Sequence, residues 1–84
     1  MPTIAIVDGV CLVLYPRDHL PPHLHALFAE YEAKFSIATA DVIEGSLPRD
    51  KSKSVRLWLL AHQAEVAHIW EELRAGRNAK GMIE

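Results

Sequence analysis

The N-terminal half of the chain contains short runs of β-branched and apolar residues separated by turn-forming residues. These runs occupy residues 3–7, 10–15, 23–28, 32–37 and 42–44. The first two flank Asp8-Gly9, a pair that favours the positive φ angles of a two-residue hairpin turn. Short links between successive strands are typical of antiparallel sheets. The pattern predicts a β-meander of about five strands over residues 3–45.

The hydrophobic period changes after the predicted sheet. One stripe of residues recurs every three or four positions: Val55, Leu59, His62, Val66, Ile69 and Leu73. This is the period of a helix with one buried face. We expect a helix over about residues 52–75, capped by Ser52 or Ser54 and followed by Gly76. At about 35 Å, such a helix is long enough to cross a small sheet.

These elements predict a single α+β domain over residues 1–84, with the antiparallel meander covered on one face by the long C-terminal helix. Residues 77–84 form a short tail. The hairpin at residues 3–15 is more apolar than one helix can cover. We therefore expect either a homodimer through this hairpin or a tightly bound partner protein there.

Composition narrows the class of protein further. Half of the residues are hydrophobic and 24% are charged, which is typical of an ordered globular chain. The net charge of −2 gives no general attraction to nucleic acid or to a membrane. The single Cys11 cannot form an intrachain disulfide, and the N-terminus lacks the basic residues of a secretory signal. A soluble cytoplasmic protein is expected.

A histidine cluster follows the predicted hairpin. Three of the five histidines lie in Asp18-His19-Leu20-Pro21-Pro22-His23-Leu24-His25. In an extended strand, His23 and His25 project from the same face about 6.5–7 Å apart. Two imidazoles at that spacing can bind one phosphate or one metal ion between them. Asp18 and His19, just before the pair, are further candidates.

His62 stands on the predicted buried stripe of the helix. If the helix covers the face that carries His23 and His25, the three imidazoles converge on a catalytic, anion-binding or zinc site. In the alternative, His62 is a core residue bonded to a backbone carbonyl or to Glu32 or Glu44. The alternative for His23 and His25 is that they face water on an edge strand.

Four basic residues surround the expected helix start: Arg49, Lys51, Lys53 and Arg56. Cations destabilise the N-terminus of a helix by a few tenths of a kcal/mol each, whereas its free N–H groups favour phosphate. These residues are therefore candidates for contact with phosphate or nucleic acid. The alternative is a solvated loop.

Several motifs occur in the order found in a known family. They are the hairpin, Asp18-His19-x-Pro21-Pro22-His23-x-His25, Val42-Ile43-Glu44-Gly45-x-Leu47-Pro48-Arg49 and Trp58-x-x-x-His62-x-x-Glu65. Together they resemble the small bacterial DUF4160 proteins. That family includes DhiT-type toxins of type II toxin–antitoxin pairs, so the resemblance implies a toxin with a small antitoxin-like partner. It also implies that the histidine string and His62 form the functional surface. The family often has glycine near Ala29 and Ala40, so differently shaped turns are expected there.

Three functions fit these residues. The first is a toxin acting on RNA or another phosphate-bearing target, with His23 or His25 as general acid or base and the basic residues binding phosphate. The second is a non-catalytic module that binds a partner protein or nucleic acid. The third is a metal-dependent hydrolase, for example a zinc enzyme, that uses the three histidines and Asp18. We rank them in this order because the resemblance implies a toxin and a third metal ligand is conjectural.

Overall fold

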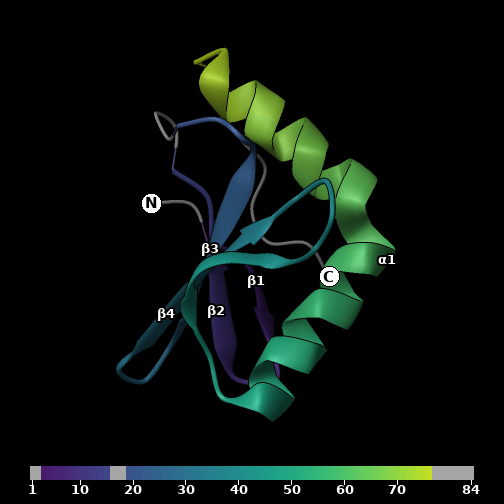
Figure 1. The fold of residues 1–84 in the computed structure, drawn as a ribbon. Helices are drawn as coiled ribbons and strands as arrows, with labels where there is room; N and C mark the ends of the chain where they lie inside the picture. Colours follow the sequence, from purple (N-terminus) through teal and green to yellow (C-terminus); the bar gives the residue numbers. More distant parts are fainter. Residues whose placement is uncertain (1–2, 16–18, 77–84) are drawn as a thin grey trace.

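The structure is a computed structural model that describes residues 3–15 and 19–76, in which five strands precede one helix (Figure 1). The elements are β1 (Thr3–Val7), β2 (Val10–Val13), β3 (His23–Phe28), β4 (Tyr31–Ser36), β5 (Val42–Ser46) and α1 (Arg49–Arg74). Neighbouring strands pair antiparallel in the order β1-β2-β3-β4-β5. The predicted α+β meander with its C-terminal helix is confirmed.

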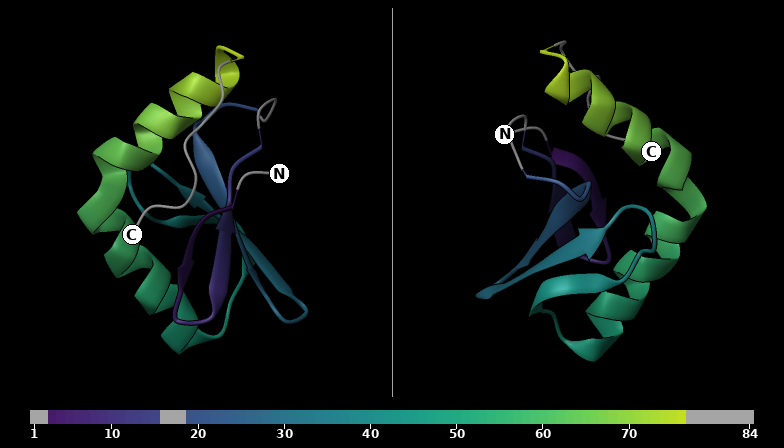
Figure 2. Two further views of the ribbon diagram at one scale, coloured as in Figure 1. Left: turned by 180° about the vertical axis from the view of Figure 1, so that it is seen from behind. Right: turned by 45° about the horizontal axis from the view of Figure 1, so that its top comes forward.

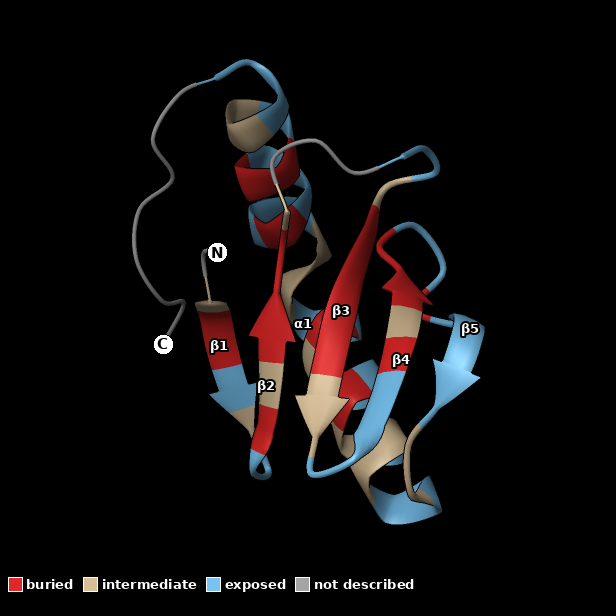
Figure 3. Cartoon of the chain, turned by 90° about the vertical axis from the view of Figure 1, so that its left-hand side faces the viewer, coloured by how far each residue is buried: buried red, intermediate tan, exposed pale blue. Residues whose placement is uncertain are grey.

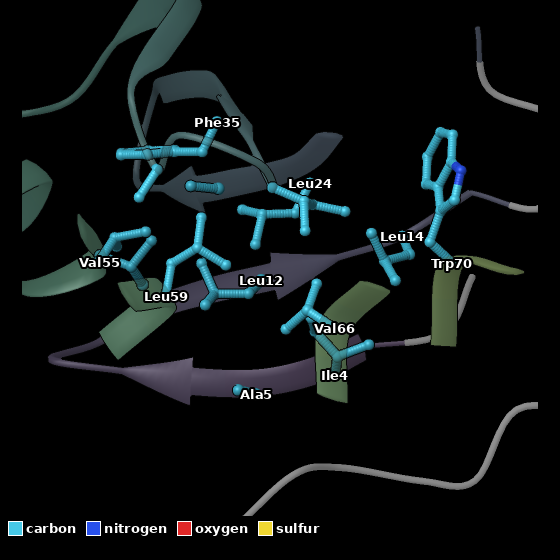
Figure 4. Packing of buried hydrophobic residues seen from close by; sticks show 14 of the residues in the cluster. Ile4, Ala5, Leu12, Leu14, Leu24, Phe35, Val55, Leu59, Val66 and Trp70 are labelled. Atoms are coloured by element: carbon cyan, nitrogen blue, oxygen red, sulfur yellow. The ribbon is translucent and has the colours of Figure 1, made fainter. Parts of the chain in front are cut away.

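The helix packs along one face of the sheet, which we call the helix face (Figure 2). Leu24 and Phe35 project to this face and share the core with Val55, Leu59 and Val66 of α1 (Figure 4). Every one of these side chains is at most 1% exposed. Four of the six residues of the predicted stripe, Val55, Leu59, Val66 and Ile69, therefore form part of the buried core, and the helical period of 3.6 residues is what allows this. Leu73 packs against the core partly buried, and His62 is not part of it.

The second face of the sheet carries the alternate residues of each strand. Directly paired residues of antiparallel strands project to the same side. The register pairs Cys11 with Leu27, Val13 with His25, and His25 with Lys34, so these side chains share the second face. His25 of β3 and Lys34 of β4 thus lie on the side of the sheet away from α1.

The helix begins at Arg49, three residues before the predicted start, and Pro48 occupies its N-cap position without a side-chain cap. The expected serine cap is wrong, because the helix starts before both serines and the Ser52 N–H donates to the Pro48 carbonyl over 2.9 Å. Ser54 instead donates a hydrogen bond of 2.8 Å to Asp8, and Lys51 forms an ion pair of 3.2 Å with the same carboxylate. Both contacts lower the pKa of the Asp8 carboxyl, and the hydrogen bond from Ser54 has the largest effect. They attach the β1–β2 turn to the helix start.

The C-terminal end of α1 agrees with the sequence. Gly76 follows the helix with a φ of +80°, and its N–H donates to the Leu73 carbonyl over 3.1 Å. A left-handed residue just after the last turn is a common helix stop. No stretch of α1 is long and apolar enough to cross a membrane.

Two alanines occupy left-handed backbone conformations in turns where the family resemblance led us to expect altered shapes. Ala29, in the β3–β4 turn, has a φ of 51°, and Ala40, before β5, has a φ of 62°. Residues with a Cβ are disfavoured there by roughly 1–2 kcal/mol. The turns keep the conformation that glycine favours although alanine occupies them.

We expect Ala29→Gly to raise the free energy of unfolding by about 0.5–1 kcal/mol, because it relieves this strain at an exposed site. Ala40 is fully buried, and Ala40→Gly removes a core methyl group worth about 0.8 kcal/mol. Its net effect should therefore be close to zero. Urea unfolding of the two variants checks this, and equal stabilisation by both would contradict the account.

Candidate functional site

His23 and His25 lie on β3, the central strand of the sheet, and they are only 5% and 6% exposed (Figure 3). The alternative that they face water on an edge strand is therefore wrong, because the chain pairs a strand on each side of β3. Their rings are in contact, with centroids 5.1 Å apart. The structure thus brings together the two histidines that the strand spacing predicted as a pair.

Hydrogen bonds fix the tautomer of both rings. The Nδ1 atom of His25 lies 3.2 Å from a carboxylate oxygen of Glu32, and the Nδ1 atom of His23 lies 2.9 Å from the Pro21 carbonyl oxygen. Both oxygens only accept hydrogen bonds, so in the neutral rings the proton is on Nδ1. Each ring is therefore oriented through a hydrogen bond at Nδ1.

Aromatic side chains hold the two imidazoles from both sides. The Tyr15 ring packs edge-on against the His25 ring, with ring centroids 4.5 Å apart. The centroid of the Trp70 ring of α1 lies 5.6 Å from that of His23. Trp70 is 1% exposed, so the helix end is packed tightly where it reaches the histidine pair. Rings held by packing and by Nδ1 hydrogen bonds have the fixed orientation that proton transfer requires.

A shallow pocket of about 340 Å³ opens on the second face beside His25. It is lined by His25, Glu32, Ala33, Lys34, Glu44 and Gly45. Lys34 and Glu44 form an ion pair of 3.2 Å across it, with the glutamate side chain 70% exposed. The pocket therefore combines an imidazole, two carboxylates and an ammonium group within reach of solvent.

Gly45 allows the strand on one side of this pocket to approach closely. Its φ is +75°, and a Cβ at this position would lie 2.2 Å from the Glu32 carbonyl oxygen. Only glycine fits so close to a neighbouring backbone. Gly45 therefore maintains the contact between β4 and β5 that forms the pocket.

The sequence patterns did not predict the contact between Glu32 and His25, nor Lys34 and Trp70 as neighbours of the site. They indicated Glu32 only as a partner for His62. The register of β3 and β4 would have indicated both residues. Lys34 is directly opposite His25, and Glu32 is opposite Leu27, two residues along the same strand. That register becomes evident once the β3–β4 turn is placed correctly.

His62 is not brought to the histidine pair. The α1 stripe packs on the helix face, whereas His25 is on the second face. The half-buried His62 ring stacks on Trp58, and its Nδ1 donates a hydrogen bond of 2.8 Å to the Trp58 carbonyl. In a regular helix, the Trp58 carbonyl accepts a hydrogen bond from the backbone N–H of His62. The backbone of His62 is not helical here, with a φ of −128° and a ψ of 18°. A side chain inserted in this way bends a helix.

The remaining sequence candidates are His19, Asp18 and the four basic residues at the helix start. His19 is exposed, and Asp18 lies outside the described residues. Of the four basic residues, Lys51 is bonded to Asp8 and Arg56 to Asp41, whereas Arg49 and Lys53 are exposed on the first turns of α1. Figure 3 places this helix start at the end of the sheet opposite the start of β3. The basic residues therefore do not join the histidine pair.

Ligands for a metal ion do not gather within residues 3–15 and 19–76. In that part of the chain, no three His, Cys, Asp or Glu side chains lie close enough to hold one ion. The predicted three-histidine arrangement is not formed, because the sheet separates His62 from His25.

Comparison with known proteins places the chain in a family. No curated protein and no solved structure gives a significant match. The family model of DUF4160, a domain of unknown function, matches residues 9–71. This range covers three quarters of the chain and includes His23, His25, Glu32 and Lys34. The chain therefore belongs to the DUF4160 family.

Proposed function

We propose that this protein is the toxin of a type II toxin–antitoxin pair and that it acts on RNA or another phosphate-bearing target. The observation that carries the proposal is the contact between His23 and His25, each anchored through Nδ1. The toxin role follows from the family resemblance. The proton chemistry follows from the two rings.

Transfer or hydrolysis at a phosphodiester needs a base for the attacking group and an acid for the leaving oxygen. Two adjacent histidines can provide both, because histidine exchanges protons near neutral pH. His25 lines the pocket and is the residue we assign to the substrate. Glu32 positions the His25 ring by accepting a hydrogen bond from its Nδ1–H group.

Lys34 is the cation best placed to hold a phosphate beside His25. It lines the same pocket, and its ion pair with the exposed Glu44 is of the kind that contributes little stability in water. A phosphate can therefore replace Glu44 at small cost. We therefore assign phosphate binding to Lys34 and not to the basic residues at the helix start, where Lys51 pairs with Asp8 and Arg56 with Asp41. We further propose that an antitoxin-like partner inhibits by covering this pocket.

Induced expression of the protein in bacteria tests the proposal. We expect growth arrest, relief of that arrest by co-expression of a small antitoxin-like partner, and cleavage or modification of RNA by the purified chain. Normal growth at high expression would contradict the toxin role. Growth arrest with intact RNA and no change in other phosphate compounds would favour the non-catalytic binding module.

A further inference from the structure

The outer surface of α1 has a hydrophobic pattern that the domain itself does not use. Eight residues alternate at spacings of three and four along the helix: Asp50, Lys53, Leu57, Leu60, Ala64, Ala67, Glu71 and Arg74. All eight are exposed, and the two leucines are 58% and 45% exposed. We call this set the outer stripe. Its spacing is the heptad pattern of helices that pack against other helices.

We propose that the outer stripe binds the outer stripe of a second copy of this chain, with the two helices antiparallel. The residues of the outer stripe alternate between the a and d positions of a heptad. In an antiparallel pair, each a position faces a d position of the other helix. If the two-fold axis passes close to His62, Leu57 faces Ala67 of the partner copy and Leu60 faces its Ala64. Each large side chain then meets a small one, and each contact occurs twice by symmetry.

The charges at the two ends of the outer stripe fit the same register. Lys53 then faces Glu71 of the second copy, and Asp50 faces its Arg74. Both pairs have opposite signs. A parallel pair would instead place Lys53 beside Lys53 and Glu71 beside Glu71, which repels. Charge complementarity therefore selects a second copy in antiparallel orientation as the occupant of this surface.

The shape of α1 places the closest approach at the leucines. The helix is bowed around the sheet, with its convex side outward (Figures 1 and 2). The break in helical angles at His62 lies within this bow. Two convex helices meet near their centres, so Leu57 and Leu60 supply the apolar contact. The charged ends lie farther apart and set the orientation.

Sedimentation velocity of the whole chain over a range of concentrations tests the proposal. We expect a monomer–dimer equilibrium in the wild type. The double variant Leu57→Gln/Leu60→Gln keeps good helix formers on an exposed surface, so it should remain folded. It should raise the dimer dissociation constant by about tenfold or more, because each leucine contact is lost twice.

A charge exchange tests the register. Lys53→Glu alone should weaken the dimer, and adding Glu71→Lys should restore it, because the opposite-sign pairs are formed again. A control, Ile6→Gln, changes a side chain that is 60% exposed on β1 and should leave the dimer intact. A monomer at every concentration, a dimer lost only in Ile6→Gln, or no recovery in the charge exchange would each overturn the proposal.

Discussion

His25→Gln is expected to abolish growth arrest and to lower activity on the phosphate-bearing target by about 10²–10⁴-fold, the usual contribution of a general acid or base. Glutamine is close to histidine in size and can still donate a hydrogen bond to Glu32, but it cannot exchange a proton at neutral pH. Growth on induction and turnover by the purified variant measure the effect.

The same variant should lose some stability, on the order of 1 kcal/mol, because the His25 ring is buried and hydrogen-bonded. A water-facing imidazole, the alternative raised from the sequence, would cost almost no stability, and the burial of the ring excludes that alternative. His68→Gln is the matched control, since the His68 side chain is 73% exposed on α1. Full growth arrest in His25→Gln would remove His25 from the mechanism.

Glu32→Gln separates positioning from catalysis. The Glu32 side chain is 54% exposed, so its replacement should leave thermal stability nearly unchanged. Activity should fall less than in His25→Gln, because the imidazole is still present. Nitrogen NMR of the His25 ring should show more of the tautomer with the proton on Nε2. An unchanged tautomer would mean that Glu32 does not orient the ring.

Leu59→Ala is expected to lower the free energy of unfolding by about 2–5 kcal/mol, because it leaves a cavity in the core. Leu59 is fully buried between α1 and the sheet (Figure 4). Small domains have total stabilities of roughly 5–15 kcal/mol, so much of the variant should be unfolded at moderate urea concentrations. The urea midpoint, followed by circular dichroism, measures the loss.

The neighbouring leucine is the matched control for this substitution. Leu60 is 45% exposed on the outer stripe, so Leu60→Ala should change stability by less than about 0.5 kcal/mol. The comparison is made at low protein concentration, where self-association does not contribute. Equal midpoint shifts for the two variants would mean that the buried stripe of α1 is assigned to the wrong face.

The sequence by itself determined the elements of this fold. The five strands were predictable because runs of β-branched and apolar residues are separated by turn-forming residues. The buried stripe of α1 was predictable because its apolar residues recur with the helical period of 3.6. The hairpin turn was predictable for the same local reason, and Asp8 and Gly9 adopt φ angles of 51° and 79°. The pairing of His23 with His25 also follows from strand geometry alone.

Only the tertiary structure decided what surrounds those histidines. Which face of the sheet α1 covers depends on the packing of the whole core, and that choice separates His62 from His25. The Glu32 contact depends on strand register, and the Trp70 contact depends on where the bent helix ends. These are interactions between residues distant in sequence or on separate elements, so no local pattern contains them. The pairing of the two imidazoles therefore follows from the local strand geometry. The groups that orient the imidazoles are brought to them only by the tertiary structure.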